Sequence, residues 1–192
     1  MADGELVGAD GRPRCAWGNT AEIYWAYHDE EWGVPLRGEV ELFERLSLEA
    51  FQSGLSWLTI LRKREGFRRA FAGFEPARVA EFGQADFDRL MADVEIVRNR
   101  AKIDAVLRNA KVVVELDEPL DEFLWSFAPD NSGRVRPATM ADVPAVTPES
   151  TAMAKALKKR GFAFVGPTTC YALMQATGMV DDHIASCWRA TA

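Results

Sequence analysis

Two cysteine–histidine pairs, one near each end of the chain, constrain this sequence most strongly. His183 and Cys187 are four positions apart near the C-terminus. Cys15 and His28, thirteen positions apart, lie near the N-terminus. If residues 183–187 form a helix, their two side chains share one face and can hold one metal ion. Two cysteines and two histidines complete a tetrahedral zinc shell. Such a site would join the two ends and close everything between them into one unit.

The same residues also have an ordinary structural interpretation. An isolated histidine and cysteine four positions apart are more often packing residues than ligands, and cysteine is commonly buried without a metal. The spacing from Cys15 to His28 is longer than that in small zinc fingers. His28 and His183 are, however, the only histidines in the chain, and both fall in the same shell. Spacing alone therefore leaves both interpretations open.

Length and composition fit one domain, or two small lobes, in a chain of 192 residues. Hydrophobic residues make up 48% of the chain and include six tryptophans, which is ample for a core and argues against disorder. Three cysteines do not form a disulfide framework and suit a reducing cytoplasm, so we expect a cytoplasmic location. We expect no signal peptide and no membrane partner, because no apolar run is placed or long enough for either.

The formal net charge of −6 argues against a nucleic-acid partner for the chain as a whole. The basic residues are nevertheless clustered. The clusters are Arg62–Arg64 with Arg68 and Arg69, then Arg98, Arg100 and Lys102, and then Lys155 with Lys158–Arg160. Any one cluster is more typical of a solvated helix face. The total charge therefore does not exclude local contact with nucleic acid.

The hydrophobic pattern is helical along most of the chain, and no run of alternating strands occurs. We expect helices near 20–27, 39–53, 56–71, 77, 85–91, 99–116, 119–125, 150–160 and 168–177. Residues 1–14 lack periodicity and are expected to form a flexible leader. Residues 130–148 are expected to form a long surface loop. The predicted fold class is all-α, with many short helices in one or two lobes.

A set of short segments occurs in a distinctive order between Cys15 and Cys187. The segments are 14–17 (RCAW), 24–29 (YWAYHD), 31–35 (EWGVP), 48–57 (LEAFQSGLSW), 125–127 (WSF), 158–166 (KKRGFAFVG), 170–171 (CY), 174–176 (MQA) and 182–183 (DH). A single piece is a weak signal, but the ordered set covers nearly the whole chain after the leader. Together the segments resemble the bacterial 3-methyladenine DNA glycosylase I family.

The resemblance implies a helix-hairpin-helix DNA glycosylase fold in a single catalytic unit of residues 15–192. Within this unit we expect a zinc lobe of residues 15–38 and 150–192, and a helix-hairpin-helix lobe of about 39–149. The implied reaction hydrolyses the N-glycosidic bond of 3-methyladenine in alkylated double-stranded DNA, which releases the free base and leaves an abasic site. A monomer is expected. The resemblance also implies structural zinc bound by Cys15, His28, His183 and Cys187.

Two features depart from the family's pattern. Where the family usually has glycine in the hairpin, this chain has Glu95, within residues 93–98. Glycine permits a positive φ and close approach of a phosphate, whereas glutamate adds a negative charge. Some relatives also have glycine and glutamine where this chain has Ala50 and Phe51. That change is expected to reshape the pocket wall and to keep the acid at position 49.

A base inside a duplex has to be flipped out before an enzyme can act on it. The resemblance favours Trp57 and Tyr27 for an aromatic slot around the flipped base. Trp17 and Tyr24 are the next candidates for the same slot. N3-methylation makes adenine cationic, and a cation over an aromatic ring gains about 0.5–2 kcal/mol. Without the family match, the same residues would be interpreted as ordinary core aromatics.

Glu49 is the candidate catalytic residue. It lies on an apolar helix face within residues 46–51, where a carboxylate is costly to bury without a partner. A cationic base with amino hydrogens would be such a partner. We expect Glu49 to accept hydrogen bonds from the base and to stabilise the positive sugar in the transition state. The sequence alone favours a surface glutamate, and the family match favours the site.

Contacts with DNA are expected from one loop and from the hairpin. Gly54 and Leu55 lie between two predicted helices, and Leu55 is the candidate wedge that fills the gap left by the flipped base. Phosphate contacts are expected from backbone amides of the hairpin, near residues 93–100. Basic side chains are expected to add to them, namely Arg98, Arg100 and Lys158, with Lys155 and Arg160.

Two other functions fit parts of the sequence. A non-catalytic module that recognises alkylated DNA would keep the aromatic slot and release no base. A zinc metallohydrolase is disfavoured, because four protein ligands leave no position on the metal for a water molecule.

Overall fold

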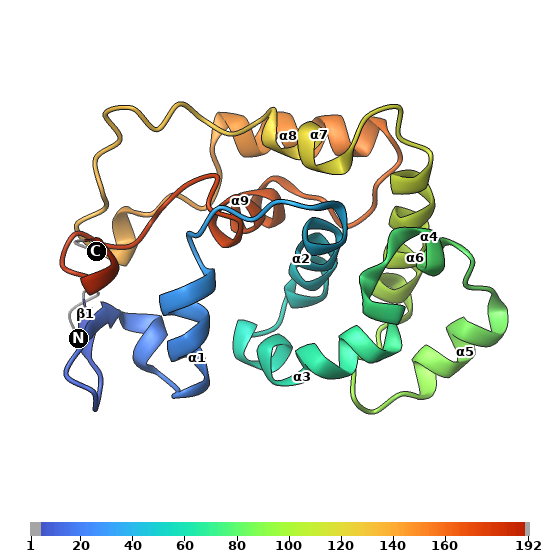
Figure 1. The fold of residues 1–192 in the computed structure, drawn as a ribbon, viewed down its shortest axis with the longest axis horizontal. Helices are drawn as coiled ribbons and strands as arrows, with labels where there is room; N and C mark the ends of the chain where they lie inside the picture. The colour runs from blue at the N-terminus through green and yellow to red at the C-terminus, as the bar shows by residue number, and fades with distance from the viewer. Residues whose placement is uncertain (1–4, 191–192) are drawn as a thin grey trace.

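The computed structural model describes residues 5–190, and most of them form short helices (Figure 1). The helices are α1 (Ile23–Ala26), α2 (Glu39–Gln52), α3 (Trp57–Ala70), α4 (Pro76–Ala80), α5 (Gln84–Ala92), α6 (Arg100–Val114), α7 (Leu120–Trp125), α8 (Pro148–Lys159) and α9 (Pro167–Ala176). Two strands, β1 (Glu5–Val7) and β2 (Pro13–Cys15), precede them. Short 3₁₀ turns lie at Ala16–Asn19, Ala72–Phe74, Met140–Asp142 and Trp188–Ala190, and a π-helical turn, Tyr27–Glu31, continues α1. The predicted mostly helical architecture is confirmed.

Two helices begin where their capping residues predict. Ser56 accepts a hydrogen bond from the Thr59 amide at 3.3 Å, at the start of α3. Asn99 accepts one from the Lys102 amide at 3.1 Å, at the start of α6. Each cap satisfies a backbone donor that has no partner within its own helix. These two caps place the loop before α3 and the hairpin before α6, which are both candidate DNA contacts.

Helix α8 begins earlier than the sequence predicts. The hydrophobic pattern predicts a helix from about residue 150, but the Thr147 hydroxyl accepts a hydrogen bond from the Ser150 amide at 3.2 Å and caps the helix there. Pro148 then occupies the first helical position, where its missing N–H costs nothing. The predicted start is therefore wrong by one turn, and the irregular segment before α8 ends at Thr147.

The leader predicted for residues 1–14 is also partly wrong, because residues 5–15 form an antiparallel pair of strands. Arg14 explains how this polar segment is held. Its guanidinium is 1% exposed and donates to Asp29 Oδ1 at 2.8 Å and to Asp10 Oδ2 at 2.6 Å. The pair of strands β1 and β2 is held by these charge-assisted bonds and shows no apolar periodicity, so the hydrophobic pattern did not reveal it. Residues 1–4 lie outside the described residues.

The core consists of two apolar clusters that do not follow the predicted lobes. The predicted zinc lobe combines residues 15–38 with residues 150–192. In the structure α8 and α9 pack into the larger cluster together with α2 and α7, because their apolar faces are directed at those helices. The smaller cluster joins the two ends of the chain and consists of Cys15, Tyr24, Tyr27, Trp32, Leu61, Ala176, Ile184 and Cys187.

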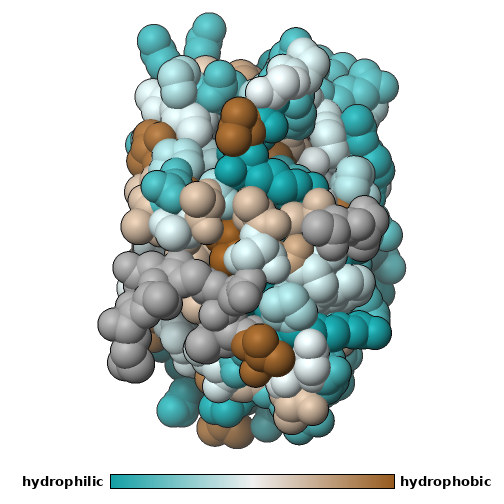
Figure 2. Space-filling view, turned by 90° about the vertical axis from the view of Figure 1, so that its left-hand side faces the viewer, coloured by the Kyte–Doolittle hydropathy of each residue, from teal (hydrophilic) through white to brown (hydrophobic). Residues whose placement is uncertain are grey.

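The two ends of the chain lie on the same side of the molecule, at the left of Figure 1. Figure 2 shows this side in space-filling form, with apolar residues in separate places among polar ones. Scattered apolar residues of this kind are normal on a protein surface. No helix within residues 5–190 is long and apolar enough to cross a membrane.

Candidate functional site

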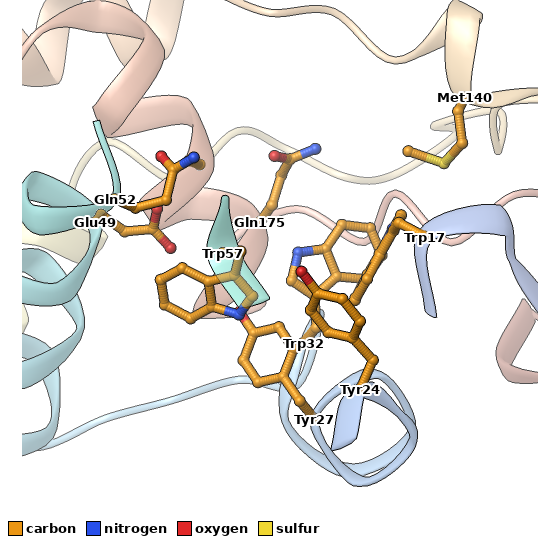
Figure 3. Close-up of a pocket in the computed structure, with 10 residues that line it drawn as sticks. Trp17, Tyr24, Tyr27, Trp32, Glu49, Gln52, Trp57, Met140 and Gln175 are labelled. Atoms are coloured by element: carbon orange, nitrogen blue, oxygen red, sulfur yellow. The ribbon is translucent and has the colours of Figure 1, made fainter. Parts of the chain in front are cut away.

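A pocket of about 250 Å³ lies between the N-terminal helical segment, α2, α3 and α9. Its volume is at the small end for ligand sites, which suits a ligand of the size of one nucleobase. The pocket brings together the predicted acid and all of the predicted aromatic residues (Figure 3). Its lining residues are Trp17, Tyr24, Tyr27, Trp32, Glu49, Gln52, Trp57, Met140, Ala172 and Gln175.

Aromatic rings form two walls of this pocket. Tyr27 and Trp57 contact each other with centroids 5.3 Å apart and form the wall beside Glu49. Trp17 packs edge-on against Tyr24 at 5.4 Å and forms the other wall. Because Tyr27 and Trp57 touch, the pocket leaves room for a flat ligand against their rings and not between them. Their faces nevertheless offer the electron-rich surface that attracts a cation.

The Glu49 carboxylate has an unusual environment for a charged group. Glu49 is 5% exposed, and no residue within 5–190 donates a hydrogen bond to its carboxylate. Burial raises the pKa of Glu49 to about 7, while the charge of Arg45 works in the opposite direction. A buried carboxylate without donors is unfavourable unless a ligand supplies them. The pocket therefore offers an acceptor to a ligand that carries hydrogen-bond donors or positive charge.

Sequence reasoning missed several polar and apolar residues of the pocket. Gln52 lies one helical turn after Glu49, and this spacing was a signal that could have identified it. Gln175 comes from α9, and its Nε2 donates to Asp182 at 2.9 Å. Trp32 belongs to a segment already noted for the family resemblance. Met140 comes from the long irregular segment, where no periodic pattern exists to place it.

Three of the four predicted metal ligands form one buried group. The ligand atoms of Cys15, His28 and Cys187 all lie within 4.8 Å of one another. Cys187 Sγ is 3.6 Å from His28 Nε2. The hydrogen bond with Cys15 lowers the pKa of the Cys187 thiol, and His28 lowers it further. Thiolate and imidazole donors at this separation fit a metal ion such as zinc.

His183 lies beside this group but outside it. Its ring is 4.8 Å from the His28 ring, and its Nε2 is 3.3 Å from the His28 carbonyl oxygen. Asp29 Oδ1 is 2.8 Å from His28 Nδ1, and Asp181 Oδ1 is 2.7 Å from His183 Nδ1. Carboxylates on Nδ1 commonly orient metal-binding histidines and leave Nε2 for the metal. The His28 ring is therefore oriented with Nε2 toward Cys187, whereas Nε2 of His183 is directed at the His28 carbonyl oxygen and lies outside the group.

The sequence left open whether residues 183–187 form a helix, and in the structure this stretch is not helical and contains a turn. Asp181 accepts a hydrogen bond from the His183 amide at 3.1 Å, and such local bonds compete with helix formation. The Ala185 amide donates to the Pro137 carbonyl at 2.9 Å, which anchors the turn to the preceding loop. His183 and Cys187 thus approach His28 from a loop and not from one helix face.

Glycine residues provide the space for both imidazoles. A Cβ at Gly18 would lie 2.7 Å from the His28 ring, which is closer than real contacts allow. A Cβ at Gly33, whose φ is +77°, would lie 3.0 Å from the His183 ring. These two glycines are therefore needed to place the histidines.

Two pocket residues connect the pocket with the cysteine–histidine group. Trp17 packs against the His28 ring at 5.1 Å, and Trp32 against the His183 ring at 4.7 Å. Trp17 and Trp32 also contact each other at 5.1 Å. One wall of the pocket thus rests on the histidines that join the two ends of the chain.

The loop with the candidate wedge is short and held from two sides. Leu55 is 38% exposed, and Gly54 has a φ of +79°, which glycine adopts without strain. The Gln52 side chain donates to the Leu55 carbonyl at 2.8 Å. From α6, the Lys102 ammonium donates to the carbonyls of Phe51, at 2.8 Å, and of Ser53. An exposed leucine on a fixed loop suits insertion into a base stack.

The predicted hairpin lies between α5 and α6, and Glu95 fits it without a positive φ. The Glu95 amide donates to Asp93 Oδ1 at 2.8 Å. A Cβ at Gly66 of α3 would lie 2.6 Å from the Glu95 carbonyl oxygen, so the close approach occurs at Gly66. The Glu95 carboxylate faces Arg69 at 3.3 Å, which offsets its charge. The hairpin therefore forms without glycine at position 95.

The structure does not bring all the predicted basic residues together. Arg98 and Arg100 are exposed at the hairpin end of α6. Lys158 is exposed at the end of α8, next to Gly161, which lies against Val112 in the last turns of α6. At 1.5 Å per residue, that end of α6 is about 18 Å from the hairpin. Lys158 is thus separate from the hairpin cations.

The fold and pocket define a helical protein with an aromatic, acidic site for one small flat ligand. A sequence model of the family described as methyladenine glycosylase matches residues 17–190. The DNA-3-methyladenine glycosylase 1 of Escherichia coli K12 is 45% identical over 177 residues, which cover 91% of this chain and 95% of that protein. The DNA-3-methyladenine glycosylase of Haemophilus influenzae is 44% identical over 177 residues, which cover 91% of this chain and 96% of that protein.

Solved structures agree with the sequence comparisons. A crystal structure of 3-methyladenine DNA glycosylase I has a TM-score of 0.86 at 45% identity, covering 91% of this chain and 98% of that one. A crystal structure of a variant of another 3-methyladenine DNA glycosylase I, in complex with 3-methyladenine, has a TM-score of 0.84 at 36% identity, covering 92% of this chain and 96% of that one. This chain therefore belongs to the methyladenine glycosylase family, as its ordered motifs predict.

Proposed function

We propose that this protein is a DNA glycosylase of base-excision repair, which hydrolyses the N-glycosidic bond of 3-methyladenine in alkylated DNA. The observation that carries this function is the Glu49 carboxylate, buried between aromatic walls without a donor from the described chain. A purine that carries positive charge and amino hydrogens supplies what this group lacks. Family membership and the 45% identity to a protein named for this activity support the assignment.

Base selection follows from charge and shape. A flipped 3-methyladenine lies against Tyr27 and Trp57, whose ring faces attract its positive charge. Glu49 accepts hydrogen bonds from its amino group, and such charge-assisted bonds contribute about 1.5–3 kcal/mol. Unmodified adenine has the same outline without the charge. The site therefore favours the methylated base by electrostatic attraction more than by size.

The chemical step needs little acid catalysis. The methyl group leaves a full positive charge on the base, so the electrons of the breaking bond between sugar and base neutralise it as the base departs. Positive charge then develops on the sugar, and the Glu49 carboxylate stabilises it. Water adds to the sugar carbon and loses a proton. The products are free 3-methyladenine and an abasic site.

Double-stranded DNA is the proposed partner, with the wedge loop and the hairpin as the contact surface. Leu55 enters the gap left by the flipped base, and Lys102 ties this loop to the first turn of α6. Backbone amides of the hairpin, with Arg98 and Arg100, hold a phosphate. Contacts of this local kind are compatible with a net charge of −6.

Structural zinc is proposed for the cysteine–histidine group. Cys15, His28 and Cys187 would hold the ion, with His183 as the fourth ligand, and a full shell would give it a structural role. The carboxylates on both imidazoles support this assignment. The three free thiols also fit the proposed reducing cytoplasm, in which the protein would act as a monomer.

A non-catalytic module for alkylated DNA is the alternative function. A duplex with a single 3-methyladenine separates the two, because an enzyme converts it to an abasic site that alkali cleaves. The proposal expects cleavage at the lesion after incubation with catalytic amounts of protein. Tight binding to the lesion without any cleavage would favour the recognition module.

A further inference from the structure

Arg45 lies on α2 one helical turn before Glu49, yet it does not line the pocket. It is 7% exposed, and its guanidinium carbon is 5.4 Å from the Tyr27 ring. Its Nη2 donates to Glu31 Oε2 at 3.0 Å. Its buried Nη1 has no hydrogen-bond partner within the described chain. An arginine in such a place is costly to bury unless its charge serves a purpose.

The ion pair with Glu31 does not cancel the charge of Arg45. Arg64 of α3 donates two hydrogen bonds to the same carboxylate, at 2.6 and 2.9 Å. Two guanidinium groups therefore share one carboxylate, and one positive charge is left over next to the pocket. Glu49 is the acidic residue of the pocket lining, and its ionised form would balance this charge.

The charged groups around Tyr27, which lines the pocket beside Glu49, come from several elements. Arg45 lies on the same helix as Glu49, Glu31 on the π-helical turn, and Arg64 on α3. The α9 residues in the pocket lining are uncharged. Burial raises the pKa of Glu49 to about 7, and Arg45 is the charged group that lowers it. The pKa of Glu49 therefore depends on two opposing effects, burial and the charge of Arg45.

We propose that Arg45 is a positioning residue for base excision, whose uncompensated charge favours the ionised form of the Glu49 carboxylate while Glu31 holds the guanidinium away from it. This inference rests on the proposed function of Glu49. In the described chain Glu49 forms no ion pair, so both of its oxygens stay available to the base. A direct pair with Arg45 would occupy the oxygens that bind the base. Arg45 thus acts through space, and Glu31 and Arg64 fix its place.

The test measures single-turnover release of 3-methyladenine from duplex DNA as a function of pH. The charge on the methylated nucleotide is fixed, so the acidic limb of the profile reports the protein. At sub-saturating protein, where the profile reports the unliganded protein, this limb is expected near pH 7 for the wild-type protein, since burial raises the pKa of Glu49 to about 7. Arg45→Met removes the charge and keeps an unbranched side chain, and should move the limb to higher pH by about one unit or more. Arg45→Lys should restore the wild-type position.

Two further variants sharpen the test. Glu31→Gln removes negative charge from the same cluster and should move the limb in the opposite direction, to lower pH. Arg37→Met is the matched control, because Arg37 is exposed and pairs with Asp121 away from the pocket. It should leave the limb unchanged.

A second readout does not depend on activity. The carboxyl resonance of Glu49, assigned through Glu49→Gln in carbon-labelled protein, gives its titration directly. A wild-type protein that releases no base would refute the proposed function, while this titration still decides the role of Arg45. An unchanged titration in Arg45→Met overturns the inference, even if the variant is slower at every pH. Where Arg45→Met does not fold, an unchanged titration in Glu31→Gln overturns it.

Discussion

At the scale of single residues, Glu49 depends on neighbours that are distant in sequence. Tyr27 and Trp57 exclude water from one side of it, and Arg45 supplies charge from its own helix. The sequence motifs predicted the acid and the aromatic rings. They did not predict Arg45, because an arginine on an amphipathic helix is usually exposed, and only the fold shows that this one is buried.

Substitution of Glu49 by glutamine tests the charge directly. Glu49→Gln keeps the shape of the side chain and removes the carboxylate, so a charge-assisted hydrogen bond of about 1.5–3 kcal/mol is lost. The affinity for free 3-methyladenine should fall about tenfold or more. Tryptophan fluorescence follows the titration, since Trp57 and Trp17 line the pocket.

Glu39→Gln provides the control for this substitution. Glu39 is exposed at the start of the same helix, and its loss should leave binding unchanged. If Glu49→Gln bound the base as tightly as the wild-type protein, Glu49 would not be part of the site.

At the scale of elements, the sequence predicted most helices but not the segments held by specific polar bonds. Ser56 and Asn99 cap α3 and α6, which begin within one residue of their predicted starts. The N-terminal strands depend on the buried Arg14, and the turn near His183 depends on Asp181, so apolar periodicity carried no signal for either. His183 and Cys187 lie in an irregular segment of this kind, whereas Glu49, Trp57 and Gln175 of the pocket lie on regular helices.

The wedge loop should act on the duplex and not on the base. Leu55→Ala removes the exposed side chain that fills the gap, while Gln52 and Lys102 still hold the loop. We expect slower excision from duplex DNA and unchanged affinity for free 3-methyladenine. A mismatch opposite the lesion lowers the cost of flipping, so it should restore part of the rate. Equal loss of excision and of free-base affinity would place Leu55 in the pocket instead.

The hairpin should produce a modest salt dependence of DNA binding. Each neutralised phosphate contributes a slope of about −0.9 in log K against log salt, and we expect about two to four such contacts. Arg98→Ala should reduce the magnitude of this slope by about one contact. Lys158→Ala, which changes a cation away from the hairpin, should leave the slope unchanged. A slope as steep as that of a strongly basic repressor would contradict this local mode of binding.

At the scale of the whole molecule, the cysteine–histidine group joins the two ends and supports one wall of the pocket. Trp17 and Trp32 pack on the two histidines and also line the pocket. The residue types alone predicted that the cysteine–histidine group brings the two ends of the chain together. They did not predict that this group supports the pocket, because that depends on how the aromatic rings pack in space.

Loss of the metal should therefore weaken both the fold and base binding. Cys187→Ser should abolish metal binding and lower Tm by at least about 5 °C, since binding energy at a structural site is folding energy. Cys170→Ser is the matched control, because Cys170 is equally buried but lies in the larger core. It should keep the metal. Absence of bound zinc from protein purified without chelator would refute the proposed site.

The most direct test of the central claim identifies the bases released from methylated duplex DNA by the wild-type protein and by Glu49→Gln. The account predicts that the wild-type protein releases free 3-methyladenine, leaves abasic sites, and spares unmodified adenine. Glu49→Gln should release the same base more slowly, because the bond to a cationic base is already weak. Release of unmodified adenine at a similar rate, or no release of 3-methyladenine by the wild-type protein, would contradict the account.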